Sequence, residues 1–217
     1  MYSIQCFITT FFHTNTYIVS HFSTKDQEQP DCVFIIDAGG ERQDIQKYIK
    51  QLKRCDAFVL THGHFDHTSG LIFLKRQFPN APIAIHKEDA CYLGEEADEF
   101  NKDEFYPDGL FFYVDNFFFK EGHLPYPTIT LNDNDVLPFA KDWKVIHTPG
   151  HSLGSICLYN QKEAMLFTGD TLFADGDVGR TDKYGGNEEQ LKKSISKIMS
   201  LPRRTKIYPG HGPAFEL

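Results

Sequence analysis

The chain has 217 residues, of which 41% are hydrophobic, and a formal net charge of −8 at pH 7. This length and apolar content predict one well-filled domain over residues 1–217. The acidic balance argues against a nucleic-acid partner, because phosphate backbones are bound by clustered basic residues. No apolar run approaches the roughly 18 residues of a membrane span. Five cysteines without a Cys-x-x-Cys pair indicate a reducing compartment. We therefore expect a cytoplasmic protein without a membrane partner.

The first part of the chain alternates extended apolar runs with turns. Strands are predicted over 2–8, 16–20 and 33–37. Ile45, Ile49 and Leu52 then repeat at the spacing of an amphipathic helix over 41–54. The apolar run 57–60 is a further extended segment, and a helix is predicted over 68–78.

Residues 95–130 interrupt this alternation and are predicted to be an insertion. The segment opens with the acidic run 95–99 and becomes aromatic at 111–113 and 117–119. Three roles fit these aromatic side chains: a small satellite core, a contact in a homodimer, or a lid over a site. The sequence leaves all three open.

The second part of the chain returns to strands, followed by one helix and a last strand. The helix is predicted over 188–200, and Asn187 with Gln190 provides an N-cap signal. Two β-rich halves with helices predict an α+β fold, in which two sheets pack face to face with helices outside. The strands of this part are predicted over 143–147, 155–159, 164–168 and 206–208.

The segment Thr61 to His67 has four potential metal ligands within six positions. His62 and His64 are two residues apart in an extended segment, so their side chains point the same way. Asp66 and His67 follow and point toward a neighbouring site. Further candidates lie beside glycines at His151, Asp170 and His211. Five imidazoles and two carboxylates are ligands for zinc, iron or manganese, and they suffice for two ions.

Several motifs resemble those of the metallo-β-lactamase-fold hydrolases. The signature is His-x-His-x-Asp-His at 62–67, followed by Gly150-His151, Asp170 and His211. The small glyoxalase II-like (hydroxyacylglutathione hydrolase-like) members are the most similar. They share the segments His-Thr-Pro-Gly-His-Ser-Leu-Gly at 147–154, Phe-Thr-Gly-Asp-Thr-Leu-Phe at 167–173, Gly-Arg-Thr-Asp at 179–182 and Tyr-Pro-Gly-His-Gly-Pro at 208–213.

This resemblance implies a four-layer αββα sandwich with the metal site at one edge of the two sheets. It also implies two divalent ions, with zinc the expected metal. The first ion would be bound by His62, His64 and His151, the second by Asp66, His67 and His211, with Asp170 bridging. A hydroxide shared by two such ions hydrolyses electrophilic carbonyls, so the family resemblance predicts a small-molecule thioester or ester as substrate. Asp66 and Asp170 are the predicted catalytic carboxylates.

Other reactions also fit this fold. Members with a carboxylate at the position of Asp170 are thioesterase-like, lactonase-like or nuclease-like, whereas true β-lactamases generally lack it. A lactonase or another esterase is therefore one alternative. Persulfide dioxygenases share Gly-Arg-Thr-Asp and use one iron, which here would be bound by His62 or His64, His151 and Asp170.

Arg180 is the predicted substrate-binding residue, since it falls where glyoxalase II enzymes carry a basic residue for a glutathione carboxylate. Arg180 either grips a substrate carboxylate or pairs with a nearby acid. Asp182 departs from the family pattern, which has a tyrosine there. The chain also ends six residues after His211, without the helical C-terminal domain that completes the glutathione site. We therefore do not expect glutathione specificity.

Overall fold

The computed structural model describes residues 1–9, 12–40 and 42–217. Its first sheet has six strands, which lie across the sheet in chain order. β1 to β3 are antiparallel, whereas β3 to β6 are parallel, so the carboxyl ends of β3, β4 and β5 lie at one edge. The strands are β1 (Tyr2–Thr9), β2 (Thr14–His21), β3 (Cys32–Ile36), β4 (Ala57–Val59), β5 (Ile83–His86) and β6 (Ile129–Leu131).

The second sheet also has six strands, in the order β12-β11-β10-β9-β8-β7. β10 and β11 are parallel neighbours, and the other pairs are antiparallel. The strands are β7 (Val136–Leu137), β8 (Ala140–His147), β9 (Ile156–Asn160), β10 (Met165–Gly169), β11 (Lys206–Pro209) and β12 (Phe215–Glu216).

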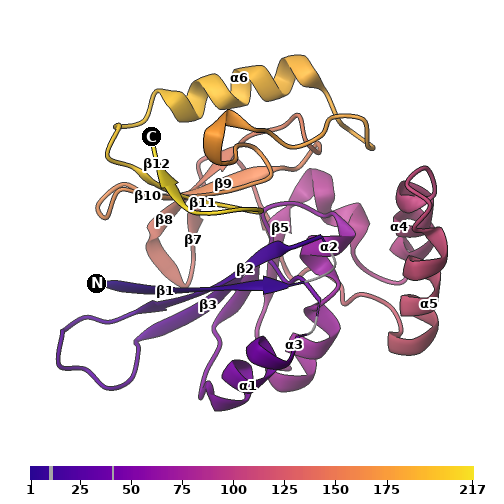
Figure 1. Cartoon of the computed structure of the whole chain (residues 1–217). Coiled ribbons are helices and arrows are strands. Elements are labelled where there is room, and N and C mark those ends of the chain that lie inside the picture. Colours follow the sequence, from indigo (N-terminus) through magenta and orange to yellow (C-terminus); the bar gives the residue numbers. More distant parts are fainter. Residues whose placement is uncertain (10–11, 41) are drawn as a thin grey trace.

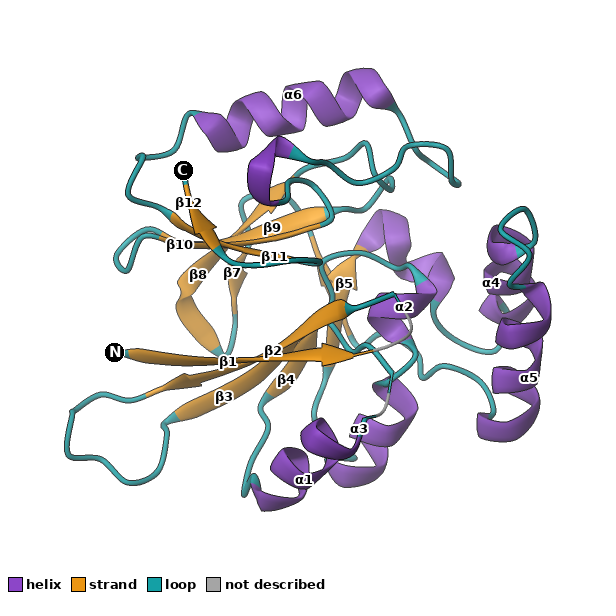
Figure 2. Ribbon diagram, in the orientation of Figure 1, coloured by secondary structure: helices purple, strands orange, loops and turns teal. Residues whose placement is uncertain are grey.

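Helices cover the outer faces of both sheets. In Figure 1, α6 lies outside the second sheet and α1 and α3 lie outside the first, while α4 and α5 stand at one side. Figure 2 shows the two sheets facing each other between these layers. The αββα sandwich predicted from the sequence is therefore confirmed. The helices are α1 (Gln43–Gln51), α2 (Phe65–Thr68), α3 (Leu71–Gln77), α4 (Ala97–Phe105), α5 (Phe111–Glu121) and α6 (Glu188–Met199), with 3₁₀ segments η1 (Lys87–Tyr92) and η2 (Ala174–Gly176).

Alternation along the strands separates the core into layers. In β2, Tyr17 and Val19 point toward the second sheet, where they join a cluster with Trp143 and Phe167. Ile18 points the other way, into a cluster under α1 and α3. Burial of these apolar side chains supplies most of the favourable free energy of folding. No helix of the described residues is long and apolar enough to cross a membrane.

The predicted helix over 68–78 is wrong at its start. The chain forms α2 over 65–68, breaks at Gly70 and continues as α3, because the Gly70 N–H bonds to the Ala38 carbonyl at 2.8 Å. A side chain at Gly70 would collide with the Gly39 backbone. Asp66 and His67 therefore lie within a short helix rather than before one.

The other predicted helices are observed with shifted ends. The helix predicted over 41–54 is α1, and its first predicted residue, Glu41, lies outside the described residues. The N-cap prediction is confirmed, since Asn187 Oδ1 accepts from the Gln190 N–H at 2.9 Å. The short strands β5, β6, β7 and β12 were not predicted.

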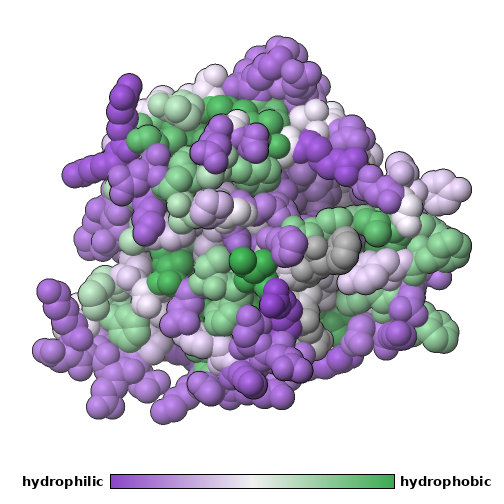
Figure 3. Space-filling view, in the orientation of Figure 1, coloured by the Kyte–Doolittle hydropathy of each residue, from purple (hydrophilic) through white to green (hydrophobic). Residues whose placement is uncertain are grey.

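The segment predicted to be an insertion, 95–130, forms α4 and α5. Phe105, Val114 and Phe118 are buried in the same cluster as α3 rather than in a separate satellite core. Phe112 and Phe119 are exposed, and hydrophobic surface is visible over these helices in Figure 3. The segment between α4 and α5 borders the cavity described below.

Candidate metal centre

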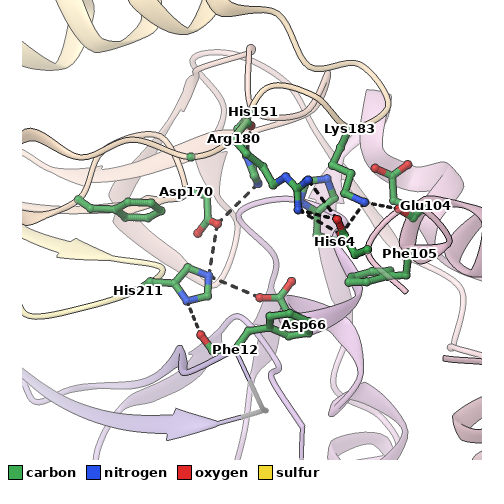
Figure 4. Close-up of a pocket in the computed structure, with 13 residues that line it drawn as sticks. Phe12, His64, Asp66, Glu104, Phe105, His151, Asp170, Arg180, Lys183 and His211 are labelled. Atoms are coloured by element: carbon green, nitrogen blue, oxygen red, sulfur yellow. Dashed lines mark hydrogen bonds and ion pairs between the residues drawn. The ribbon is translucent and has the colours of Figure 1, made fainter. Parts of the chain in front are cut away.

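The seven predicted ligands meet at one edge of the two sheets. Figure 4 shows five of them around one pocket: His64, Asp66, His151, Asp170 and His211. Each comes from a segment that leaves the end of a strand, where backbone turns can aim side chains across the edge. His62 and His64 follow β4, Asp66 and His67 lie in α2, His151 follows β8, Asp170 follows β10 and His211 follows β11.

The ligand atoms form three overlapping groups, within each of which they lie within 4.8 Å of one another. Asp170 belongs to one group and lies close to histidines of the other two. Its Oδ1 is 3.3 Å from His67 Nε2, and its Oδ2 is 3.3 Å from His211 Nε2 and 3.6 Å from His151 Nε2. The groups are His62, His64 and His151; Asp66, His67 and His211; and His62, His67 and Asp170.

Hydrogen bonds outside the centre orient the histidines. His67 Nδ1 lies 2.9 Å from Asp37 Oδ2, and His151 Nδ1 lies 2.7 Å from the Arg180 carbonyl oxygen. His211 Nδ1 lies 3.1 Å from the Phe12 carbonyl oxygen. These acceptors require a proton on each Nδ1, which leaves the Nε2 of a neutral imidazole as an acceptor. The Nε2 lone pairs therefore converge.

When the rings are neutral, the converging Nε2 atoms have no donor to accept from among the described residues. His62 Nε2 and His151 Nε2 are 3.2 Å apart, and His67 Nε2 and His211 Nε2 are 3.3 Å apart. The buried His64 Nε2 has no hydrogen-bond partner there. Acceptor atoms held this close repel one another unless a cation lies among them. This donor set fits divalent metal ions that accept nitrogen and oxygen.

The pKa shifts of the histidines agree with a role as metal ligands. Burial lowers the pKa of His62 and His64 well below the ordinary value, so both stay neutral and able to ligate. Although burial opposes it, hydrogen bonds to Asp170 and Asp66 raise the pKa of His211 to about 9. Metal binding would release such a proton, because only the neutral imidazole coordinates.

Sequence reasoning missed two buried carboxylates that support the centre. Asp37 accepts hydrogen bonds from both N–H and hydroxyl of Thr61, each at 2.8 Å, besides contacting His67. Asp89 in η1 accepts from Gly63 N–H at 2.9 Å and from Ser152 at 2.7 Å. Asp37 directly follows β3 at the edge where the ligands lie, so its position in the sequence could have indicated a role at the centre. No sequence feature near Asp89 indicates such a role.

Gly210 lets β11 approach the centre. A side chain there would collide with Asp170 Oδ1 and with the His67 ring. The Gly210 N–H instead bonds to the Gly169 carbonyl at 2.8 Å, which fastens the loop before His211 to the loop before Asp170. A glycine beside these ligands is thus required by close backbone packing.

A cavity of about 260 Å³ opens beside the ligands. Phe12, Phe105 and Phe173 are the aromatic residues of its lining, which also includes Arg180 and Lys183. The Arg180 guanidinium is paired with Asp182 at 2.6 Å and with Asp108 at 3.1 Å. Of the two alternatives for Arg180, the structure thus shows pairing with nearby acids, at a position that also borders the cavity.

Comparisons with known proteins agree with this architecture. A family model described as the metallo-β-lactamase superfamily matches residues 9–211. Hydroxyacylglutathione hydrolase GloC of Haemophilus influenzae is 32% identical over 186 residues, which cover 82% of this chain and 79% of that protein.

Two solved structures are similar over almost the whole chain. The di-iron-bound form of TTHA1623 has a TM-score of 0.74 at 27% identity and covers 98% of this chain and 94% of its own. The B3 metallo-β-lactamase BLEG-1 has a TM-score of 0.78 at 29% identity, and the match covers 99% of this chain and 94% of BLEG-1. The fold binds divalent metals, as the di-iron form shows. The chain belongs to the metallo-β-lactamase superfamily.

Proposed function

We propose that this protein is a metal-dependent hydrolase of thioesters with a binuclear centre. The observation that carries the proposal is the position of Asp170, whose two oxygens lie near histidines of both ligand groups. A carboxylate can serve two cations at once, whereas a neutral imidazole has a single lone pair for coordination. The arrangement thus favours two ions that share one carboxylate.

The proposed division follows the ligand groups. His62, His64 and His151 would hold the first ion, and Asp66, His67 and His211 would hold the second. Zinc is the proposed metal, and iron and manganese accept the same ligands. Two such ions, when bound, would supply a hydroxide at neutral pH and polarise a carbonyl.

The residues around the centre would position the substrate. The outer hydrogen bonds of Asp37 and of the Arg180 carbonyl keep two ligand imidazoles in one tautomer and orientation. Phe12, Phe105 and Phe173 offer an apolar surface that excludes water beside the reacting carbonyl. Arg180 lies at the same cavity and is the proposed contact for an uncharged polar part of the substrate.

A thioester is proposed over other substrates because Asp170 fills the bridging position and because GloC is named a hydroxyacylglutathione hydrolase. The similarity to a B3 metallo-β-lactamase makes a β-lactam the necessary control substrate. A lactone tests the remaining esterase alternative.

The test combines metal analysis with turnover. Protein purified without added metal is analysed for zinc, iron and manganese, and hydrolysis is measured with S-D-lactoylglutathione, a neutral thioester, a lactone and a chromogenic cephalosporin. We expect two ions per chain and thioester hydrolysis. One iron per chain, with oxygen consumption on glutathione persulfide and no thioester hydrolysis, would establish a dioxygenase instead. Preference for the lactone or the cephalosporin would also reject the proposal.

A further inference from the structure

Arg180, Lys183 and Asp108 lie together in the cavity lining and form its polar wall. A second carboxylate, Asp182, pairs with Arg180. Arg180 Nε donates to Asp182 Oδ1 at 2.6 Å, and Arg180 Nη2 donates to Asp182 Oδ2 at 2.6 Å. Asp108 binds the other edge of the guanidinium, with contacts of 3.1 and 3.2 Å to Nη1 and 3.2 Å to Nη2. Both edges that could receive a carboxylate in a bidentate geometry are therefore filled.

Asp108 also forms an ion pair with the second cation, Lys183. Lys183 Nζ lies 2.8 Å from Asp108 Oδ2, and it donates to the Glu104 carbonyl oxygen as well. The Lys183 side chain is only 7% exposed, so few positions are open for a further anion. Its pairing with Asp108 offsets the cost of desolvating the ammonium group.

The two carboxylates differ in origin. Asp182 is two residues from Arg180 and belongs to the same loop, whereas Asp108 is 72 residues away, between α4 and α5 of the insertion. The Arg180 backbone is tied to the centre through its carbonyl, which accepts from His151 Nδ1. Asp108 therefore extends from the insertion to a cationic wall that is anchored beside the ligands.

We propose that Asp108 is a specificity-determining residue, which occupies Arg180 and Lys183 with an internal carboxylate and so disfavours substrates that present a carboxylate at this wall. The favoured class is thioesters that are uncharged near the reacting carbonyl. This inference rests on the proposed thioesterase function for its kinetic test, while its binding test is independent of it. The insertion at 95–130 thereby contributes to substrate selection.

The kinetic test uses two thioesters that differ in one group. S-acetyl-3-mercaptopropionate carries a carboxylate, and S-acetyl-3-mercaptopropionamide carries a neutral amide of similar shape. In the wild type we expect kcat/KM for the amide to equal or exceed that for the carboxylate. In Asp108→Asn, kcat/KM for the carboxylate substrate should rise about five- to tenfold, because two cations become available at a partly solvent-screened site. The amide should change less than twofold.

The binding test uses S-methylglutathione, which carries two carboxylates and has no thioester. Isothermal titration should show about five- to tenfold tighter binding to Asp108→Asn than to the wild type. The matched control is Asp103→Asn, which removes one negative charge from an exposed position of α4 in the same insertion. Its affinity should equal that of the wild type.

The outcomes separate the two proposals. If the wild type hydrolyses neither thioester, the proposed function fails, and the titration still decides the role of Asp108. If Asp108→Asn changes both substrates equally, or leaves S-methylglutathione binding unchanged or weaker, Asp108 only fastens the insertion and the inference is wrong. A wild type that prefers the carboxylate substrate tenfold or more would also overturn it, without any variant.

Discussion

The carboxylate of Asp89 accepts a hydrogen bond from the hydroxyl of Ser152 at 2.7 Å. The same Oδ2 accepts from the Gly63 N–H, between His62 and His64, while Oδ1 accepts from the Gly154 N–H at 2.6 Å. Asp89 is buried, and this burial raises the pKa of its carboxyl. One side chain thus joins the two loops that carry the first group of ligands.

We expect Asp89→Asn to weaken metal binding at His62, His64 and His151. An amide offers one acceptor oxygen, so its NH₂ group must face a backbone N–H or the Ser152 hydroxyl, leaving a donor unsatisfied. Loss of such an outer support lowers metal affinity by about 10- to 100-fold. Competition with a chromogenic chelator measures this affinity.

The matched control for Asp89 is Glu88→Gln, at the neighbouring exposed position of η1. It changes the same charge without touching either ligand loop. Equal zinc affinity in the two variants would show that the Asp89 hydrogen bonds do not orient the ligands.

Asp66→Ala is expected to remove mainly the second ion. Asp66 Oδ2 lies 3.4 Å from His211 Nε2 and accepts from Thr14 Oγ1 at 2.7 Å, so its geometry is held by the fold. Without it, only two histidines of that group remain. Elemental analysis should show about one ion per chain, with thioester turnover reduced by orders of magnitude. Two retained ions with full turnover would remove Asp66 from the ligand set.

Asp170→Asn is expected to weaken both ions. The substitution replaces one carboxylate oxygen by an NH₂ group that donates where a cation needs an acceptor. Because Asp170 contacts His67, His151 and His211, neither group should keep its original affinity. Stepwise zinc titration followed by calorimetry provides the measurement. One site with unchanged affinity would contradict a bridging role for Asp170.

Acid should destabilise the protein through His86, away from the metal centre. His86 is buried at the end of β5 and stacks on His147 with ring centroids 4.1 Å apart. Burial, together with His147 and Lys87, lowers the pKa of His86 to about 4, while Asp133 and Asp135 act in the opposite direction.

Between pH 6.5 and 4, His86 therefore binds a proton more readily in the unfolded chain than in the folded chain. The free energy of unfolding should be fully retained above pH 6.5 and fall by about 1–3 kcal/mol as the pH drops to 4, with no further loss from His86 below that. Urea unfolding with a chelator present measures it. His86→Phe keeps an aromatic ring against His147 without titrating, so it should show a shallower decline. Identical declines would exclude His86 as the cause.

Local patterns in the sequence were enough to predict much of the fold. β2 and β3 were predicted from extended apolar runs, and these runs reflect the burial of both faces of each strand, in two different clusters. The cap of α6 at Asn187 is a contact between residues three apart, so it is visible in the sequence. The break at Gly70 was missed because its cause, the Ala38 carbonyl, lies far away in the chain.

The sequence by itself determined the candidate ligands, because four ligand-type residues between His62 and His67 have no other common explanation. The tertiary structure decided everything that depends on pairing between distant segments. Asp37 and Asp89 became supports of the ligands only when parallel strands brought their ends to one edge. Arg180 pairs with Asp108 only because folding brings the segment between α4 and α5 to the border of the cavity. An isolated carboxylate has no local signature, since its role is set by the groups that folding places around it.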